Sequence, residues 1–245
     1  MMIFMFVLGT IIGSFLNVVI YRLPKKMSFV YGTSICPECK TRIHPMDLMP
    51  IVSYLILRGK CRHCCKPISL RYPVIESVTG LAFLLVYNQY SISWTTLIGL
   101  ILASVLIIIT MIDIDTMEIY DRFHVVIMLL ALAYIPVSGL PLFDRIIGFF
   151  IISVPFLIIA LITNGLGGGD IKLIAAAGLL LGYRSTLVTF IIASIFGGMI
   201  AIMLILTKQQ NRKSLIAFGP YLCVGIFIAF LYGRQLFDWY MSMIT

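Results

Sequence analysis

The sequence has few charged side chains. Only 11% of its 245 residues are Asp, Glu, Lys or Arg, whereas 61% are hydrophobic, and the mean hydropathy is +1.08. An ordinary soluble domain carries about 25% charged residues, so this class of protein is excluded. Apolar runs of about 17–25 residues recur, and each is long enough to cross a bilayer as a helix. Because backbone amides in lipid must be hydrogen-bonded within their own segment, we predict an all-α polytopic membrane protein.

Acidic residues are scarcer than basic ones, with 10 Asp and Glu against 18 Lys and Arg. The net charge of +8 alone could indicate nucleic-acid binding. However, ten of the basic residues lie between Arg22 and Arg71, in the one long polar segment. The positive-inside rule places such a segment in the cytoplasm. We therefore expect the lipid bilayer as a partner, and no nucleic acid.

The first apolar run, residues 1–20, has no positive charge before it. A secretory signal carries its positive charges first, so we predict an uncleaved span with its N-terminus outside. About eight transmembrane helices are expected in all, the others at residues 74–90, 94–112, 123–137, 146–163, 173–182, 186–207 and 215–232. This topology leaves 15 of the 18 basic residues inside and places three outside, namely Arg145, Arg184 and Arg234.

The polar segment contains two Cys-x-x-Cys pairs, which are separated by 21 residues. Two such pairs supply four thiolates that can close tetrahedrally on Zn²⁺, and a closed four-sulfur site is structural. We predict a small cytoplasmic zinc-binding loop domain over residues 21–73, with the ligands Cys36, Cys39, Cys61 and Cys64. Cys65 is a competing fourth ligand, whereas His44 and His63 are expected to be solvated.

Acidic residues gather at two places in the predicted membrane domain, residues 74–245. Four lie close together at the end of the 94–112 span: Asp113, Asp115, Glu118 and Asp121. Asp170 follows the glycine-rich stretch 165–169. An acid at the edge of the membrane has a large desolvation cost and is a candidate functional residue. The alternatives are a solvated helix end for the cluster and a flexible turn with a helix-capping Asp170 for the glycine-rich stretch.

The predicted topology brings Asp113 and Asp170 to the cytoplasmic ends of two spans, at similar depth. Two carboxylates that meet in one site share a proton, because like charges a few ångströms apart cannot both ionise cheaply. One can then act as a base toward a water, and the other can polarise a peptide carbonyl and protonate the leaving amine. The glycines would let an extended substrate lie beside Asp170.

Five motifs in this order resemble the type IV prepilin leader peptidases: residues 13–24 (GSFLNVVIYRLP), the two Cys-x-x-Cys pairs, Arg71-Tyr72-Pro73 with Glu76, Ile112-Asp113, and Gly167-Gly168-Gly169-Asp170-Ile171-Lys172. The resemblance implies a GxGD-type aspartic protease of the bacterial cytoplasmic membrane. Such enzymes remove the short basic leader of type IV prepilins or pseudopilins after a glycine. Many then methylate the new N-terminus with S-adenosylmethionine.

The same resemblance assigns the catalytic pair to Asp113 and Asp170, with Asp115 and Asp121 as rivals for the first position. The family usually has proline where this chain has Tyr120, which puts the conformation after Thr116 in doubt. Residues that support the active site would be Gly167, Gly168, Gly169 and Lys172. We further expect that the acids of the cluster that follow Asp113 attract the basic leader: Asp115, Glu118 and Asp121.

Methyl transfer rests on the resemblance, because the sequence has no glycine-rich nucleotide-binding fingerprint. Substrate or methyl-donor contacts are assigned to Asn17, Arg22, Arg71 and Glu76. Asn17 fits an interhelical hydrogen bond better, and Glu76 could be a favourable acid in a first helical turn. Two other classes of function stay open. One is a proton-coupled or metal-handling transporter that uses the acids as a relay, and the other is a non-enzymatic assembly factor.

Overall fold

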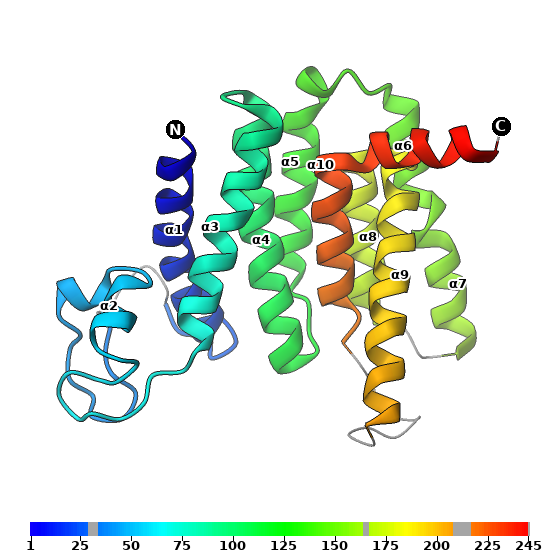
Figure 1. Ribbon diagram of the computed structural model, residues 1–245. Helices are drawn as coiled ribbons and strands as arrows, with labels where there is room; N and C mark the ends of the chain where they lie inside the picture. The colour runs from blue at the N-terminus through cyan, green and yellow to red at the C-terminus, as the bar shows by residue number, and fades with distance from the viewer. Residues whose placement is uncertain (29–33, 164–166, 208–216, 245) are drawn as a thin grey trace. The chain divides into compact units, whose positions relative to one another are not determined.

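The computed structural model is almost entirely helical (Figure 1), and it describes residues 1–28, 34–163, 167–207 and 217–244. Its elements are α1 (Met2–Arg22), η1 (Pro45–Leu48), α2 (Val52–Ile56), α3 (Arg71–Tyr90), α4 (Trp94–Thr116), α5 (Asp121–Ser138), α6 (Leu142–Ile151), α7 (Ser153–Thr163), α8 (Gly168–Leu181), α9 (Tyr183–Leu206) and α10 (Gly219–Ile244). Extended pairing within the described ranges is limited to two isolated bridges. The predicted all-α fold is confirmed. Gly165 and Leu166, the polar segment 208–213 and the expected start of the last span at residue 215 lie outside the described residues.

The chain has enough apolar helices for a multi-pass membrane protein. Six stretches of the described chain are long and apolar enough to cross a bilayer, and they correspond to α1, α4, α5, α6 with α7, α9 and most of α10. The two other predicted spans correspond to α3, with 20 residues, and α8, with 14. All eight predicted spans are therefore helical, six of them long and apolar enough to cross a bilayer, so the predicted count of about eight is approximate.

The chain folds as two compact units, residues 1–96 and 97–245. In the first unit α1 and α3 lie side by side (Figure 1), in contact through small residues. A Cβ on Gly9 would lie 2.7 Å from the Cα of Gly80, and one on Gly13 would lie 2.8 Å from the Cα of Glu76. No side chain larger than hydrogen fits at either glycine without moving the other backbone. These glycines therefore fix how closely the two helices approach.

In the second unit α8 is surrounded by the neighbouring helices α5, α6, α7, α9 and α10. Fourteen helical residues span about 21 Å, which is less than the roughly 30 Å of a bilayer's hydrocarbon core. Nine residues of α8 are buried, including Ala175, Ala176, Ala177 and Gly178. A helix this short is stable in a membrane protein because it contacts protein rather than lipid on its sides. Its small residues allow close packing, as where Gly178 lies against the backbone of Gly148 in α6.

Several helix bounds differ from the sequence prediction. α4 continues to Thr116, so Asp113 and Asp115 are helical, and it ends where Met117 adopts a φ of +55°. The expected span 146–163 is divided at Ile152 into α6 and α7. The last span was expected to end at residue 232, but α10 continues to Ile244 and turns across the end of the second unit (Figure 1).

Candidate active site and cysteine cluster

Asp113 and Asp170 lie at helix ends in the same compact unit. Asp113 occupies the last turn of α4, and Asp170 occupies the first turn of α8. Both are buried, with 4% and 9% of their surface exposed. They are close enough for the charge of Asp113 to act on Asp170. The fold thus brings together two carboxylates that are 57 residues apart in the sequence.

Each of these carboxylates has a buried oxygen without a partner. In the part of the chain that the structure describes, no group donates a hydrogen bond to Asp113 Oδ2 or to Asp170 Oδ1. The backbone N–H of Gly219, the first residue of α10, is directed at the Asp113 carboxylate. Buried carboxylate oxygens are costly unless something donates to them. Water and a substrate amide are the donors that an active site would supply.

Three glycines precede Asp170, and each has a different environment. Gly167 is the N-cap of α8 with a φ of −69°, so its role does not require a left-handed backbone. A Cβ there would lie 3.3 Å from Asp170 Oδ2, and a Cβ on Gly169 would lie 3.0 Å from the Cβ of Ile119. A Cβ on Gly168 would have no heavy atom within 4 Å. Gly168 is therefore the open position, whereas Gly167 and Gly169 give room to neighbouring protein atoms.

The acids that follow Asp113, including its rivals Asp115 and Asp121, lie on the surface. Asp115, Glu118 and Asp121 are all exposed, in contrast to the buried pair. Asp121 Oδ1 accepts a hydrogen bond of 2.7 Å from Lys172 Nζ, and His124 Nδ1 lies 3.4 Å from the same oxygen. This contact links the first turn of α5 to α8, which carries Asp170. Lys172 and Asp121 thus support the position of α8 and do not belong to the buried pair.

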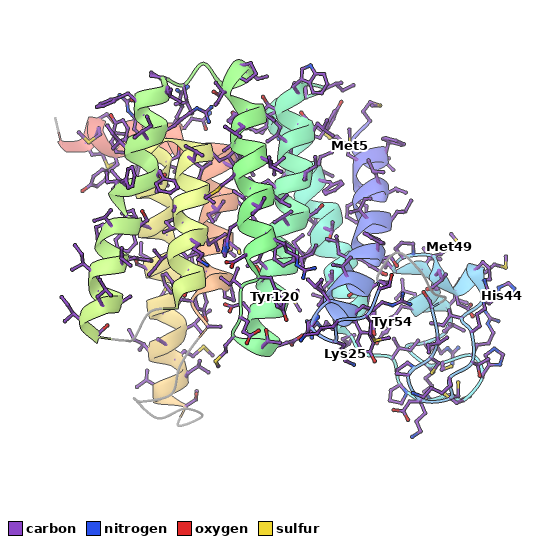
Figure 2. All side chains as sticks on the ribbon, turned by 180° about the vertical axis from the view of Figure 1, so that it is seen from behind. Met5, Lys25, His44, Met49, Tyr54 and Tyr120 are labelled. Carbon is purple, nitrogen blue, oxygen red and sulfur yellow. The ribbon has the colours of Figure 1, made fainter. Side chains whose placement is uncertain are left out.

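The chain between α4 and α5 lies against the glycine-rich end of α8. This segment contains Tyr120, labelled in Figure 2, which takes the position where proline was expected and is the extended N-cap of α5. The neighbouring Ile119 contacts the glycines of both α8 and α10. A Cβ on Gly219 would lie 3.1 Å from Ile119 Cδ1 and 2.5 Å from Asp113 Oδ2. Tyr120 therefore begins α5 as its extended N-cap without proline.

Two residues near the carboxylates were not predicted. They are Gly219 and Cys223. Cys223 is buried in α10, is hydrogen-bonded to Thr110, and is affected by the charges of both Asp113 and Asp170. No local pattern signals either residue, because α10 meets α4 and α8 only in the folded chain.

The remaining polar candidates belong to the first unit. Asn17 donates to the carbonyls of Gly13, at 3.3 Å, and of Tyr72, at 3.2 Å, so it bridges α1 and α3. Glu76 is buried at the sixth position of α3, not in its first turn, and its Oε2 accepts a 2.7 Å hydrogen bond from the N–H of Ile51. Both side chains therefore have structural partners.

The two basic candidates, Arg22 and Arg71, begin or end helices in the first unit. Arg22, the last residue of α1, donates from Nη1 to the carbonyl of Ser28 at 3.0 Å. Arg71, the first residue of α3, is half-buried, and its backbone N–H donates to Ser69 Oγ at 3.2 Å. Arg22 thereby closes the turn that follows α1.

The four predicted metal ligands gather in one cluster. The Sγ atoms of Cys36, Cys39, Cys61 and Cys64 all lie within 4.8 Å of one another. Cys36 and Cys64 are 3.9 Å apart, close to the roughly 3.8 Å between sulfurs of a tetrahedral site with Zn–S bonds of about 2.3 Å. The donor set and its size therefore fit a zinc-binding loop.

Each cysteine pair forms the same kind of turn. The N–H of Cys36 bonds to the carbonyl of Thr41, and the N–H of Cys61 bonds to that of Lys66. After the second cysteine of each pair comes a left-handed residue, Lys40 with a φ of 60° and Cys65 with a φ of 57°. Cys65 is exposed at this turn position and lies outside the cluster.

Few apolar side chains of the cysteine region are buried, and polar contacts hold the region together. Tyr54 and Met49 lie in this region, as labelled in Figure 2. Arg62, between the cysteines of the second pair, donates two hydrogen bonds to Asp47, of 2.8 and 2.6 Å. These bonds also hold the pKa of Asp47 below its usual range, because they stabilise the carboxylate. His44 and His63 are exposed, as expected, and lie outside the cluster.

The chain matches two family models. Residues 7–90 match the bacterial peptidase A24 N-terminal domain, and residues 100–202 match the type IV leader peptidase family. A protein of Aeromonas salmonicida is 33% identical, over 98% of this chain and 93% of its own length. This chain belongs to the type IV leader peptidase family. The first match contains both cysteine pairs, and the second contains Asp113 and Asp170, so the family's two regions include both clusters described above.

Two further relatives come from other bacteria. A protein of Neisseria gonorrhoeae is 37% identical over 91% of this chain and 88% of its own length. One of Bacillus subtilis is 31% identical over 98% of this chain and 97% of its own length. All three relatives carry the name prepilin leader peptidase/N-methyltransferase. No solved structure gave a significant match.

Proposed function

We propose that this protein is a membrane aspartic endopeptidase that removes the short basic leader of type IV prepilins or pseudopilins, cleaving after a glycine. The observation that supports this proposal is the burial of Asp113 and Asp170, which interact although they belong to different helices. Both residues lie within the segment that matches the leader peptidase family. Exposed acids at the end of a helix would instead fit a solvated surface.

The proposed reaction uses the two carboxylates as a unit. One carboxylate takes a proton from a water, which attacks the carbonyl carbon of the scissile peptide bond. The other is protonated, donates a hydrogen bond to the carbonyl oxygen, and protonates the leaving amine as the C–N bond breaks. The oxygens of Asp113 and Asp170 without protein donors are the atoms available for water and for the substrate. Gly219, whose N–H is directed at Asp113, keeps that carboxylate in place.

The proposed orientation has the N-terminus outside, and the active site and cysteine region facing the cytoplasm. It rests on the positive-inside rule. A prepilin carries its basic leader on this side, ahead of an apolar membrane helix, so its scissile bond would meet carboxylates at the ends of α4 and α8. Asp115 and Glu118 are exposed next to Asp113 and would attract the leader. Asp121 contributes less, because Lys172 already neutralises it.

The function can be tested with purified protein in detergent and a prepilin substrate. We expect a product whose N-terminus begins directly after the leader glycine. When S-adenosylmethionine is added, mass spectrometry should find this N-terminus heavier by one methyl group. Transport of protons or metal ions into proteoliposomes without any cleavage would instead support the transporter alternative. A cleaved but unmethylated product would exclude only the transferase, whose proposed contacts are Asn17, Arg22, Arg71 and Glu76.

Gly168 offers a test of the substrate path. Gly168→Ala should leave stability unchanged or raise it slightly, because alanine favours helix and a Cβ would meet no atom within 4 Å. If the substrate backbone passes this position, kcat/KM should nevertheless fall about tenfold, which corresponds to about 1.4 kcal/mol. The matched control is Gly198→Ala in α9, which is equally open and should keep full activity. An unchanged kcat/KM in Gly168→Ala would contradict this substrate path.

We further propose that the four-cysteine cluster binds structural Zn²⁺. Zinc would supply folding energy that this small polar region cannot gain from an apolar core, because apparent binding energies of such sites reach about 10–16 kcal/mol. The bound ion would be held by Cys36, Cys39, Cys61 and Cys64.

Metal analysis of single variants tests this assignment. We expect about one zinc per chain in the wild type, and a loss of at least about 90% in Cys36→Ser, with faster proteolysis of residues 34–70. Cys65→Ser is the matched control and should keep its zinc, because Cys65 is exposed and lies outside the cluster. Loss of zinc in Cys65→Ser with retention in Cys64→Ser would show that Cys65, and not Cys64, is the fourth ligand.

A further inference from the structure

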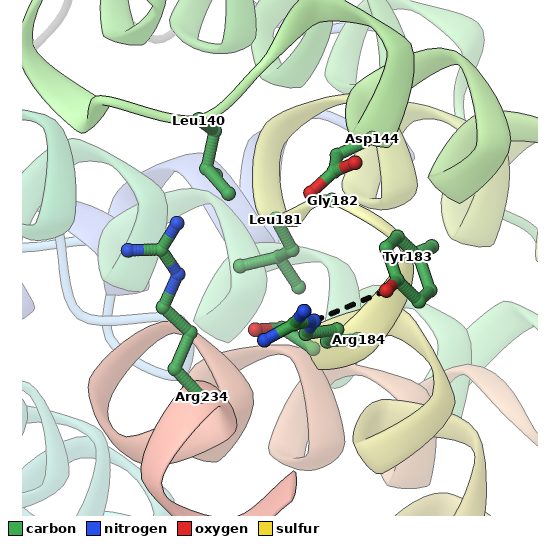
Figure 3. A pocket seen from close by; sticks show the side chains of 8 residues that line it. Leu140, Asp144, Leu181, Gly182, Tyr183, Arg184 and Arg234 are labelled. Carbon is green, nitrogen blue, oxygen red and sulfur yellow. Dashed lines mark hydrogen bonds between the residues drawn. The ribbon is translucent and has the colours of Figure 1, made fainter. Parts of the chain in front are cut away.

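A second polar site lies at the other end of α8 from Asp170. It is a cavity of about 130 Å³ (Figure 3), lined by Leu140, Asp144, Leu181, Gly182, Tyr183, Arg184, Ser185 and Arg234. These residues come from the α5–α6 connection, the first turn of α6, the junction of α8 and α9, and α10. Since α8 has 14 residues, about 20 Å of helix separate the cavity from the carboxylate pair. The cavity therefore takes no part in the proposed peptide cleavage.

Two cations and one anion line this cavity. Arg184 and Arg234 approach it from α9 and α10, and Asp144 approaches it from α6 (Figure 3). Two of the three arginines that the sequence assigns to the outside therefore meet at one place. The charge of Asp144 acts on Arg184, so the carboxylate and the guanidinium face the same space. Leu140 and Leu181 provide an apolar wall between them.

The two arginines differ in how they are held. Arg184 has two protein partners: its Nε donates to the Tyr183 hydroxyl at 3.1 Å, and Asp238 lies 3.5 Å from its Nη1. Arg234 is exposed and has no ion-pair partner among the residues that the structure describes. An arginine near the end of a membrane helix extends its guanidinium toward the interface, where anionic groups are present. Arg234 therefore has an open position for an anionic group beside a second arginine.

The surroundings of the cavity fit the membrane–water interface. α10 passes close to α9 at Gly233, where a Cβ would lie 2.6 Å from Ser185 Oγ. Beyond this point the helix turns across the end of the unit and exposes Trp239, Tyr240 and Met243. Exposed Trp and Tyr next to apolar side chains are typical of a membrane interface. The cavity is thus placed where phospholipid headgroups are the abundant anions.

We propose that this cavity binds the phosphoethanolamine headgroup of a phospholipid, in the leaflet opposite to the carboxylate pair. The phosphate would pair with Arg184 and Arg234, since guanidinium groups bind phosphate oxygens through charged hydrogen bonds. The ammonium group, two carbons away from the phosphate, would pair with Asp144. An inorganic phosphate or a phosphatidylglycerol would meet the same arginines but would bring no cation to Asp144, whose negative charge repels the phosphate. A choline headgroup has no N–H to donate to the carboxylate.

The proposal makes a selectivity prediction for lipid binding. Native mass spectrometry of the detergent-purified chain should find phosphatidylethanolamine bound about tenfold more tightly than phosphatidylglycerol or phosphatidylcholine, which corresponds to about 1.4 kcal/mol. Asp144→Asn should remove this preference while phosphatidylglycerol still binds. Arg234→Gln should weaken both lipids about tenfold. Arg42→Gln, which removes the same charge in the cysteine region, should change neither.

Three results would overturn the proposal. They are equal binding of the three lipids by the wild type, an unchanged preference in Asp144→Asn, and unchanged lipid binding in Arg234→Gln. Competition separates the two possible sources of phosphate. If inorganic phosphate or soluble glycerophosphoethanolamine at millimolar concentration displaces the lipid, the cavity is a site for soluble anions and not for lipid. Circular dichroism of each variant verifies that the lost binding does not come from unfolding.

Discussion

Replacing either Asp113 or Asp170 by asparagine is expected to lower kcat for prepilin cleavage by at least about 10³-fold. Asparagine keeps the size of the side chain but can neither take a proton from water nor give one to the leaving amine, and general acid–base catalysis contributes about 10²–10⁴-fold. Because the two carboxylates act as a unit, the double variant should be little worse than either single one. KM should change much less than kcat, since neither substitution removes volume. Cleavage should be measured by the appearance of the mature N-terminus.

The exposed acids provide matched controls. Asp115→Asn and Glu118→Gln remove the same charge close by and should keep kcat, while raising KM at low salt if these acids attract the leader. Asp121→Asn removes the ion pair with Lys172 but leaves the buried carboxylates unchanged. A moderate loss of kcat would agree with a supporting contact. Full activity in Asp113→Asn would assign the role of the first catalytic carboxylate to Asp115 or Asp121. Full activity in Asp170→Asn would remove the proposed pair altogether.

The features that local pattern determines could be predicted from the sequence. The helical membrane fold follows from the length of the apolar runs, and the four-cysteine cluster follows from the spacing of its pairs. Topology predicted that Asp113 and Asp170 lie on one side of the membrane at similar depth, and the resemblance assigned them as a pair. Their catalytic role stays a prediction.

Features that depend on which helices are neighbours were missed. Gly219 and Cys223 lie near the carboxylates only because α10 approaches α4 and α8, and nothing in their own sequence records this. The glycines before Asp170 were all expected to accommodate substrate, yet Gly167 and Gly169 give room to protein atoms and only Gly168 is open. The extension of α10 to Ile244 was missed for a similar reason. Polar residues after residue 232 ended the apolar run, although they continue as helix across the end of the unit.

Arg145 is the clearest case of a residue whose role appears only in the fold. The sequence assigned it to an outside loop, whereas it is completely buried in α6, with 0% of its surface exposed. Its Nη1 donates to the carbonyls of Leu179, at 3.0 Å, and Leu180, at 3.3 Å, in the last turn of α8. The last carbonyls of a helix have no partner within the helix. A guanidinium therefore satisfies them, and its positive charge is favoured at the negative end of the helix dipole.

The same guanidinium also holds the end of α5. It donates to the carbonyls of Ala131, at 3.4 Å, and Tyr134, at 3.3 Å, and to the hydroxyl of Ser138. The Cζ atom of Arg145 lies 5.5 Å from the centre of the Tyr134 ring. Arg145 thus joins α5, α6 and α8 through backbone carbonyls, without a carboxylate in any of these contacts. Since α8 carries Asp170 at its other end, this junction also fixes the helix on which the proposed catalysis depends.

Arg145→Met should therefore destabilise the protein by about 3–5 kcal/mol, because it leaves buried carbonyls of two helices without donors. For a chain of this length that corresponds to a fall in Tm of roughly 10 °C, measurable by thermal unfolding in detergent. The Tm of Arg145→Lys should lie between those of the wild type and Arg145→Met. A single ammonium keeps the charge but cannot reach carbonyls on two helices at once. Arg122→Met removes an exposed arginine from α5 and should change Tm by no more than about 2 °C. A Tm of Arg145→Met equal to that of Arg122→Met would show that the carbonyls of α5 and α8 do not depend on the guanidinium.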